Sequence, residues 1–157
     1  MLDKATTLLV AQPASLLNPG QDILAFVVRL HVGWQFFKAG WLKVNSWSNT
    51  LQQFQSDFQV PLLPPVPAAV LGTFGELFFP VLLWIGLTSR LASIGLQIVN
   101  IVAVMAVYHF FADGLGLADS AFADHWLWGL MLLLVTFFGP GRISLDYLLS
   151  RRATALI

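Results

Sequence analysis

Arg29 and Glu76 are charged residues that lie well inside long apolar stretches of the sequence. A charge near the centre of a bilayer costs roughly 2.5–3.5 kcal/mol on insertion scales, so each needs a partner or a purpose. From the rise of an α-helix, Glu76 lies roughly 12 to 13 Å inside the outer end of its stretch, and Arg29 lies roughly 10 Å inside the opposite end. We expect the two side chains to reach toward each other, helped by a hydrogen-bonded intermediary.

Gln97 and Asn100, in a third apolar stretch, are suited to that intermediary role. They are three residues apart, so they share one face of a helix, at depths that span those of the two charges. Together the four residues form either a satisfied buried network that fixes helix register or a polar ligand-binding site. In the second case Glu76 is either a proton acceptor or a permanently ionised anchor, and both alternatives stay open.

The first apolar stretch carries a polar and glycine-containing stripe: Arg29, Gly33, Phe36, Gly40 and Lys43. Glycines on one helix face permit a neighbouring backbone to approach closely. His31, Gln35 and Lys38 lie on roughly the opposite face. A polar face of this kind indicates contact with water, snorkelling of Lys38 or contact with a partner subunit. A second copy of the chain is one candidate for that partner.

A second polar cluster is expected near the outer ends of the third and fourth apolar stretches. It consists of His109, Asp113, Asp124 and His125. Histidine and carboxylate at helical spacing are candidate ligands for a divalent metal, and two histidines at equal depth are candidates for haem. The spacing is loose, and interfacial histidines beside aspartates have a purely structural reading, so the sequence favours neither metal nor haem.

The composition is that of a membrane protein. Of 157 residues, 57% are hydrophobic and 10% are charged, and the mean hydropathy is +0.76, whereas about a quarter of the residues in soluble domains are charged. The formal net charge of zero gives no support to a nucleic-acid partner. Because the chain has no cysteine, thiolate metal sites, iron–sulfur clusters and disulfide relays are excluded, so a redox role needs a borrowed cofactor.

Four stretches are long and apolar enough to be membrane-spanning helices. They cover about residues 22–41, 68–88, 91–111 and 122–138, and the last ends at Gly139-Pro140-Gly141. The predicted fold is an all-α integral membrane protein, a four-transmembrane-helix bundle with an interfacial helix in the first outer loop. Residues 22–150 form the membrane domain, residues 1–21 an N-terminal segment that suits an interfacial helix, and residues 151–157 a basic tail.

The distribution of basic residues predicts the orientation. With four spans, both termini lie on one side, together with five basic residues: Lys4, Arg90, Arg142, Arg151 and Arg152. The other side carries mostly acidic residues: Lys43, Asp57, Asp113, Asp119 and Asp124. The positive-inside rule therefore places both termini in the cytoplasm.

An amphipathic helix is expected in the first outer connection. Trp47, Leu51, Phe54 and Phe58 recur at spacings of four, three and four, which puts them on one helix face. The proline-rich run 61–67 then cannot continue a helix. We picture an outer lid on the membrane surface, and a plain interfacial anchor is the alternative.

Five sequence blocks resemble successive motifs of the DoxX family of bacterial inner-membrane proteins. They are RLHVGW at 29–34, KAGWLK at 38–43, GEL at 75–77, GLTSRLA at 86–92 and GPGRISLD at 139–146. The resemblance covers about residues 22–150 and implies four membrane helices. Members look linked to quinol oxidases, thiosulfate:quinone oxidoreductases, oxidative or thiol stress and metal-responsive operons. It also implies a polar framework: Arg29, Lys43, Glu76, Arg90 and Asp146.

The last of these blocks has a physical reading of its own. Ser144 is suited to cap a short amphipathic helix, and Asp146 lies on the side where Arg90 and Arg142 can pair with it. We therefore expect a cytoplasmic ion-pair network of these three charged residues.

Three functions remain open at this stage. The first is a redox-associated accessory subunit in the inner membrane whose polar pocket binds a quinone-like ligand beside Arg29 and Glu76 and which works with a partner enzyme. The second is a binding or transport protein for a lipid or amphipathic solute, and the third is a membrane anchor for a stress-response complex. No nucleophile with its base is visible in the sequence, so we expect no enzyme activity from the chain alone.

Overall fold

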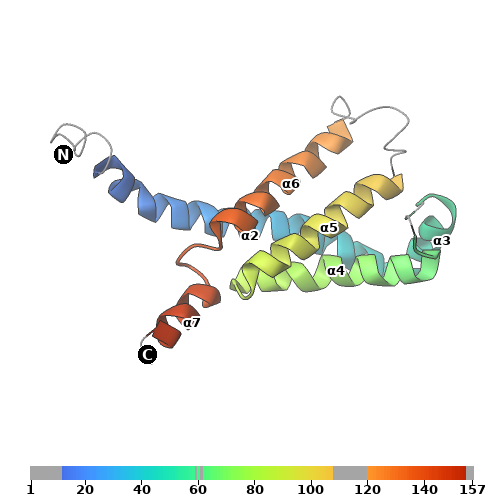
Figure 1. The fold of residues 1–157 in the computed structure, drawn as a ribbon. Helices are drawn as coiled ribbons and strands as arrows, with labels where there is room; N and C mark the ends of the chain where they lie inside the picture. Colours follow the sequence, from blue (N-terminus) through green and yellow to red (C-terminus); the bar gives the residue numbers. More distant parts are fainter. Residues whose placement is uncertain (1–11, 59, 61, 108–119, 155–157) are drawn as a thin grey trace.

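The computed structural model describes residues 12–58, 60, 62–107 and 120–154. This part of the chain folds into six α-helices and no strand (Figure 1): α2 (Gln12–Asn45), α3 (Trp47–Ser56), α4 (Pro65–Ile85), α5 (Ser89–Val107), α6 (Ser120–Phe138) and α7 (Leu145–Thr154). The prediction of an all-α fold is confirmed.

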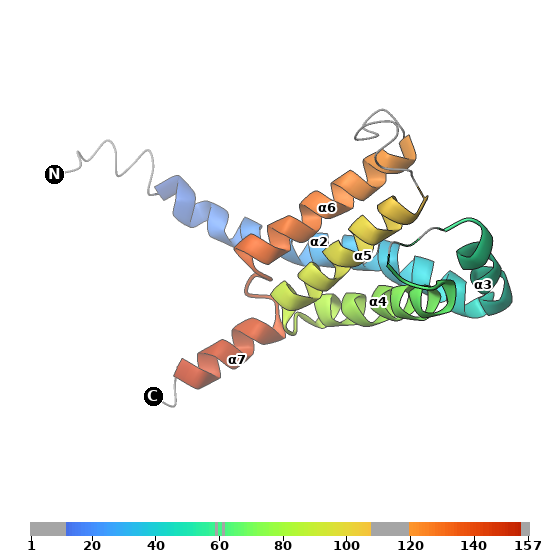
Figure 2. The same ribbon diagram turned by 45° about the vertical axis from the view of Figure 1, so that its right-hand side comes forward.

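Four long helices form the body of the molecule (Figures 1 and 2). Helix α2 packs against α4 and α6, and α5 packs against the same two helices. Helix α3 lies at the end of the bundle where α2 stops and α4 starts, and α7 projects from the opposite end. The two ends of the molecule therefore carry different short helices.

The first long helix extends beyond the predicted stretch of residues 22–41 at both ends. It begins at Gln12, passes through Pro19 and continues to Asn45. A proline inside a helix removes one main-chain donor but does not always end the helix. Residues 12–21, which the sequence suggested as a separate interfacial segment, thus continue into α2.

Helix ends follow the local sequence chemistry. Helix α4 begins with Pro65, where the missing N–H has no helical partner to lose. It ends at Gly86, whose φ of 71° is the left-handed conformation that glycine adopts without a steric penalty. Helix α6 stops before Gly139 and Gly141, which have φ values of 86° and 78°, as the predicted breaker requires.

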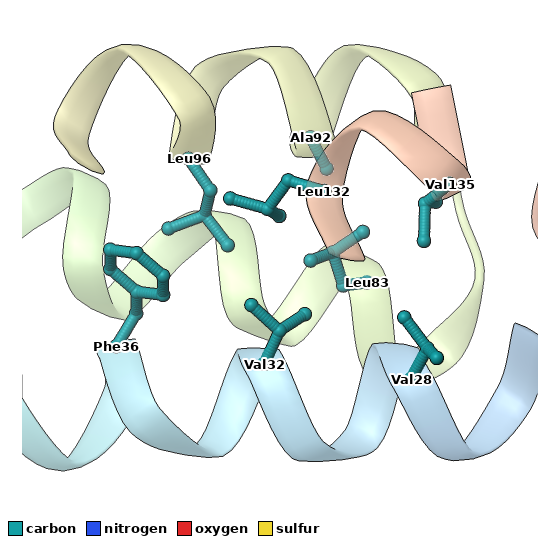
Figure 3. Close-up of a cluster of buried hydrophobic side chains, with 8 residues drawn as sticks. All are labelled: Val28, Val32, Phe36, Leu83, Ala92, Leu96, Leu132 and Val135. Carbon is teal, nitrogen blue, oxygen red and sulfur yellow. The ribbon is translucent and has the colours of Figure 1, made fainter. Parts of the chain in front are cut away.

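The core joins all four long helices (Figure 3). Its buried residues are Val28, Val32 and Phe36 of α2, Leu83 of α4, Ala92 and Leu96 of α5, and Leu132 and Val135 of α6. Apolar side chains gain little from leaving lipid tails for a protein core, so close packing rather than water exclusion stabilises such a contact in a membrane. The core fixes the helices relative to the site described below.

Many large apolar side chains point outward along the same helices. Exposed residues include Ile23, Leu24, Val27 and Trp34 of α2, Phe74 and Phe78 of α4, Ile98 and Ile101 of α5, and Leu130 and Phe137 of α6. By length and composition, residues 65–85 and 89–106 are each suited to cross a membrane, and the apolar stretch 123–138 is shorter. An apolar outer surface of this kind marks contact with lipid or a partner.

Candidate functional site

Lys43 and Glu76 form a buried ion pair between α2 and α4. The Lys43 Nζ atom lies 2.5 Å from Oε1 and 2.6 Å from Oε2 of Glu76, so the ammonium donates to both carboxylate oxygens. Glu76 is 6% exposed. The expectation that Glu76 needs a partner holds, but the partner is the lysine at the end of the predicted stripe and not Arg29.

A glycine allows this pair to form. A Cβ atom added to Gly40 would lie 2.9 Å from the Cβ atom of Glu76 and 3.0 Å from Cγ of Leu77. Real Cβ atoms essentially never approach other atoms this closely, so α2 and α4 touch at this level because the residue is glycine. The same holds at Gly33, where an added Cβ would meet the indole of Trp84. The predicted close approach along the stripe is confirmed.

Arg29 occupies a separate site nearer the other end of the bundle. Its side chain is fully buried, its Nη1 donates to the Leu83 carbonyl at 2.8 Å, and its Nη2 donates to the Ile143 carbonyl. The last carbonyls of a helix have no helical donor, and a cation is favoured there. Arg29 thus fastens the end of α4 and the segment before α7 to α2.

This placement corrects the expected pairing of Arg29 with Glu76. Leu83, which Arg29 contacts, lies seven residues beyond Glu76 on α4, or roughly 10 Å along the helix axis. The depths estimated along the two helices suggested a gap that the long side chains of Arg29 and Glu76 could cross. They did not show that the carbonyls of Leu83, at the end of α4, and of Ile143 lie within hydrogen-bond distance of the guanidinium.

A cavity of about 620 Å³ opens beside the Lys43–Glu76 pair. Its wall is mostly apolar and aromatic, and includes Phe36, Phe54, Phe58, Phe74, Phe79 and Trp128. Its polar side chains are Gln35, Lys43, Glu76 and His125. A concave apolar pocket of this size with a few polar groups is typical of sites for small organic ligands.

Helix α3 contributes to the wall of that cavity. Phe54 and Phe58 line it, and Phe54 also packs against Ala68 and Ala69 at the start of α4, with Trp47 and Leu51 alongside. The Thr50 hydroxyl donates to the Lys43 carbonyl at 3.0 Å, which ties α3 to the residue of the ion pair. The predicted aromatic face exists, and it covers the start of α4 and one side of the cavity.

Gln97 and Asn100 face α6, and they do not bridge Arg29 and Glu76 as expected. Asn100 Nδ2 donates to the His125 carbonyl at 2.9 Å, and Asn100 Oδ1 lies 2.7 Å from Nδ1 of the His125 ring. Gln97 lies beside Gly129 of α6, with its Oε1 buried and without a partner in the described part of the chain. The absence of a side chain at Gly129 leaves room for both amides.

A smaller cavity of about 140 Å³ lies between α5 and α6 and is lined by Gln97, Asn100 and His125. His125 therefore borders both cavities. The smaller one is well below the range of about 300 to 1,000 Å³ in which small-molecule sites usually fall. The larger cavity is the candidate functional site.

The candidate metal ligands come together only in part. His109 and Asp113 lie outside the described residues. Asp124 is exposed, and the Nδ1 atom of His125 is hydrogen-bonded to Oδ1 of Asn100. No group of three or more potential metal ligands forms among the residues that the structure describes.

The expected network of Arg90, Arg142 and Asp146 has a different form. The Asp146 carboxylate accepts from the main-chain N–H groups of Thr88 and Ser89, at 2.7 and 2.8 Å, and so caps the start of α5. Arg142 lies 3.6 Å from Asp22 instead. Within the described residues neither arginine pairs with Asp146, because unpaired N–H groups at a helix start compete for the carboxylate.

Sequence reasoning missed three features of the site. They are the Lys43–Glu76 pair, the Asn100–His125 pair and the aromatic contribution of α3 to the cavity wall. One usable signal was present: Lys43 lies three residues after Gly40 on the stripe expected to contact another helix. The sequence suggested that this helix is an outer lid, but it did not indicate that Phe54 and Phe58 line a cavity beside Glu76.

Comparison with known proteins places the chain in a family. A model of the DoxX family matches residues 24–109, which is more than half of the chain and includes Lys43, Glu76 and Asn100. An uncharacterized protein of Haemophilus influenzae is 28% identical over 135 residues, covering 84% of this chain and 87% of that protein. No solved structure matches. The chain therefore belongs to the DoxX family of membrane proteins.

Proposed function

We propose that this protein binds a quinone-like ligand within the membrane and serves as an accessory subunit of a redox enzyme. The observation that carries the proposal is the cavity of about 620 Å³ whose aromatic wall surrounds the Lys43–Glu76 pair. Such a volume accommodates an aromatic headgroup and the first part of an isoprenoid tail. The proposed role in a redox enzyme comes from the link to quinone enzymes that the resemblance to the DoxX family implies.

The polar groups suit a ring with oxygen substituents. A lysine ammonium has three donors, and two of those of Lys43 are directed at Glu76. The third has no partner among the described residues and can donate to a ligand oxygen. The surrounding aromatic rings offer stacking and edge contacts to a planar headgroup, so the ligand is oriented by charge at one point and by shape elsewhere.

The proposed membrane arrangement has four spans. Helices α2, α4, α5 and α6 cross the bilayer, both termini lie in the cytoplasm, and α3 rests at the outer surface of a bacterial inner membrane. The outward apolar side chains of all four helices support this arrangement, as does the basic end of the chain at Arg142, Arg151 and Arg152.

Lipid analysis tests the proposed function. The protein is purified in mild detergent and the extracted lipids are assayed for quinone. We expect wild-type protein to retain quinone, and Lys43→Met or Glu76→Gln to lower the retained amount at least about fivefold, a loss that corresponds to roughly one hydrogen bond. Asp22→Asn is the matched control, because it removes a charge contact at the opposite end of the bundle.

The proposal fails if wild-type protein carries no quinone and added quinone does not bind to it in lipid nanodiscs. It also fails if both cavity variants retain as much quinone as the Asp22→Asn control. Protein folding is checked for each variant by far-UV circular dichroism, since loss of the ion pair can destabilise the bundle.

A second candidate function is a carrier for a lipid or amphipathic solute, favoured by the position of α3. Phe54 of α3 and Phe58, two residues beyond its end, line the cavity, so movement of α3 would open a path to the outer surface. Proteoliposome transport of a fluorescent lipid measures this activity. A disulfide linking α3 to α4 should stop transport while leaving ligand binding intact.

A further inference from the structure

His125 and Asn100 form a reciprocal pair that fixes the chemistry of the histidine ring. Asn100 is 4% exposed, its Nδ2 donates to the His125 carbonyl at 2.9 Å, and its Oδ1 faces ring atom Nδ1 at 2.7 Å. Turning the amide over would place its oxygen against a carbonyl oxygen, where no hydrogen can bond. The orientation of the amide is therefore determined by the main chain.

The fixed amide selects one tautomer of the neutral imidazole. An amide oxygen only accepts hydrogen bonds, so Nδ1 must carry the proton that it donates to Asn100. In a neutral ring the other nitrogen, Nε2, then carries a lone pair and is an acceptor. The Nε2 atom has no hydrogen-bond partner among the described residues.

That acceptor belongs to a ring on the wall of the large cavity, which also contains the carboxylate of Glu76. The ring is half-buried and rests edge-on against Trp128, with ring centres 4.9 Å apart. A ligand that fills this end of the cavity leaves Nε2 unpaired unless it brings a donor. An unpaired buried polar group costs about 1 to 3 kcal/mol.

We propose that His125 accepts a hydrogen bond from a ring hydroxyl of the ligand, so that the cavity prefers a hydroquinone to the corresponding quinone. Asn100 is the positioning residue that makes this nitrogen an acceptor. The inference rests on the proposed function, since it concerns the same cavity. It adds the redox state of the ligand that the cavity prefers. A quinone carbonyl offers no donor to Nε2, whereas a hydroquinone offers two hydroxyl groups.

The tautomer is measured first, without any ligand. Nitrogen-15 spectra of protein labelled at histidine distinguish a ring with the proton on Nδ1 from one with the proton on Nε2. We expect His125 to carry the proton on Nδ1, and Asn100→Leu to redistribute it between the two nitrogens. A proton on Nε2 in the wild-type protein overturns the inference.

Ligand preference is measured next, with the protein in phosphatidylcholine nanodiscs without oxygen. The probes are a decyl-substituted benzoquinone and the same compound after two-electron reduction. We expect the hydroquinone to bind at least about tenfold more tightly, the effect of about one hydrogen bond. His125→Phe keeps a ring against Trp128 and should remove the preference, because the hydroquinone loses its acceptor and the quinone no longer leaves Nε2 unpaired. His31→Phe, on the exposed face of α2, is the control.

The outcomes separate this inference from the proposed function. Equal binding of the two probes to wild-type protein, or a preference that survives His125→Phe, overturns the inference while quinone binding still supports the proposed function. If neither probe binds the wild-type protein, both are overturned. The tautomer measurement needs no substitution at His125, so it tests the inference even if His125→Phe does not fold.

Discussion

A buried arginine and a partly buried lysine stabilise this bundle in different ways. Within the described residues Arg29 forms no salt bridge and donates to the carbonyls of Leu83 and Ile143, while Lys43 pairs with Glu76. The first arrangement completes a helix terminus and the second places a charged pair on a cavity wall. The arginine therefore joins α2 to the end of α4 and to Ile143, and the proposed function gives the lysine a part in ligand binding.

Removing one member of the Lys43–Glu76 pair should cost more than removing both. Lys43→Met leaves a buried carboxylate without its counter-charge, and we expect it to lower the free energy of unfolding by about 3 to 5 kcal/mol. The double variant Lys43→Met with Glu76→Leu should recover most of that loss. Chemical unfolding in detergent measures the three variants as a cycle, and simple additivity of the two substitutions contradicts the prediction.

Arg29→Met should destabilise the bundle even though it removes a charge from an apolar region. The Ile143 carbonyl loses the guanidinium donor, the Leu83 carbonyl keeps only the 3.2 Å bond from the Gly86 N–H, and an unsatisfied buried group costs about 1 to 3 kcal/mol. The exposed Arg90, changed to Met in parallel, should have an effect within about 0.5 kcal/mol. Equal shifts of the melting temperature for the two variants would show that Arg29 has no special role.

At this scale the sequence predicts the need for partners better than their identity. Arg29 and Glu76 were recognisable as buried charges because of the apolar residues around them, and both are buried. Their partners depend on small axial offsets between helices and on the loop that carries Ile143. Those offsets are set by packing over the whole bundle, which no local pattern encodes.

The contact between α2 and α4 depends on glycines at the interface. An added Cβ atom at Gly40 meets α4 side-chain atoms at about 3 Å, whereas one at Gly20 meets nothing within 4 Å. Both glycines belong to the same helix, so they form a matched pair in which only the neighbour differs.

Gly40→Ala should be destabilising and Gly20→Ala neutral or stabilising. The first forces α2 away from Glu76, at a cost of about 1 to 3 kcal/mol. The second replaces glycine with the best helix former and should gain up to about 1 kcal/mol. Thermal unfolding of the two proteins in one detergent gives the comparison, and shifts of the same sign would refute the steric explanation.

The start of α5 is capped from a distant part of the chain. Asp146 accepts from two main-chain N–H groups there, so Asp146→Ala should lower the free energy of unfolding by about 0.5 to 2 kcal/mol. Asp146→Asn keeps an oxygen acceptor and should lose less. Hydrogen exchange at Thr88 and Ser89 reports the effect locally, and unchanged protection in Asp146→Ala would contradict it.

Elements were predictable where apolar runs end at strong breakers. The end of the fourth stretch at Phe138 agrees with α6, because glycines in the left-handed conformation follow it. The start of α2 was not predicted, since the segment before residue 22 contains two prolines, Pro13 and Pro19, and no long apolar run. Helix α3 was recognised from its period, but its place over the cavity is a tertiary contact.

The whole molecule has two chemically distinct ends. One end holds α3, whose Phe54 lines the cavity, and the other holds α7 with Arg151 and Arg152 in its last turn. A bilayer would separate these ends, as in the proposed topology. The all-α architecture and the exposed apolar belt support this arrangement.

Single cysteines test the topology directly, because the chain has none of its own. Ser48→Cys on α3 and Arg152→Cys on α7 both replace exposed residues. In intact spheroplasts we expect a membrane-impermeant maleimide to label the Ser48→Cys variant and not the Arg152→Cys variant. Labelling of the second before lysis would place the C-terminal end outside and refute the proposed orientation.

The contact of Arg29 with Ile143 has a consequence for how the protein is made. Its two partners are 114 residues apart in sequence. At a synthesis rate of about 5 to 20 residues per second, the ribosome needs on the order of 10 s to reach the carbonyl that Arg29 requires. Until then the guanidinium in α2 lacks one of its two main-chain acceptors, so this contact between α2 and the segment before α7 can form only late in synthesis.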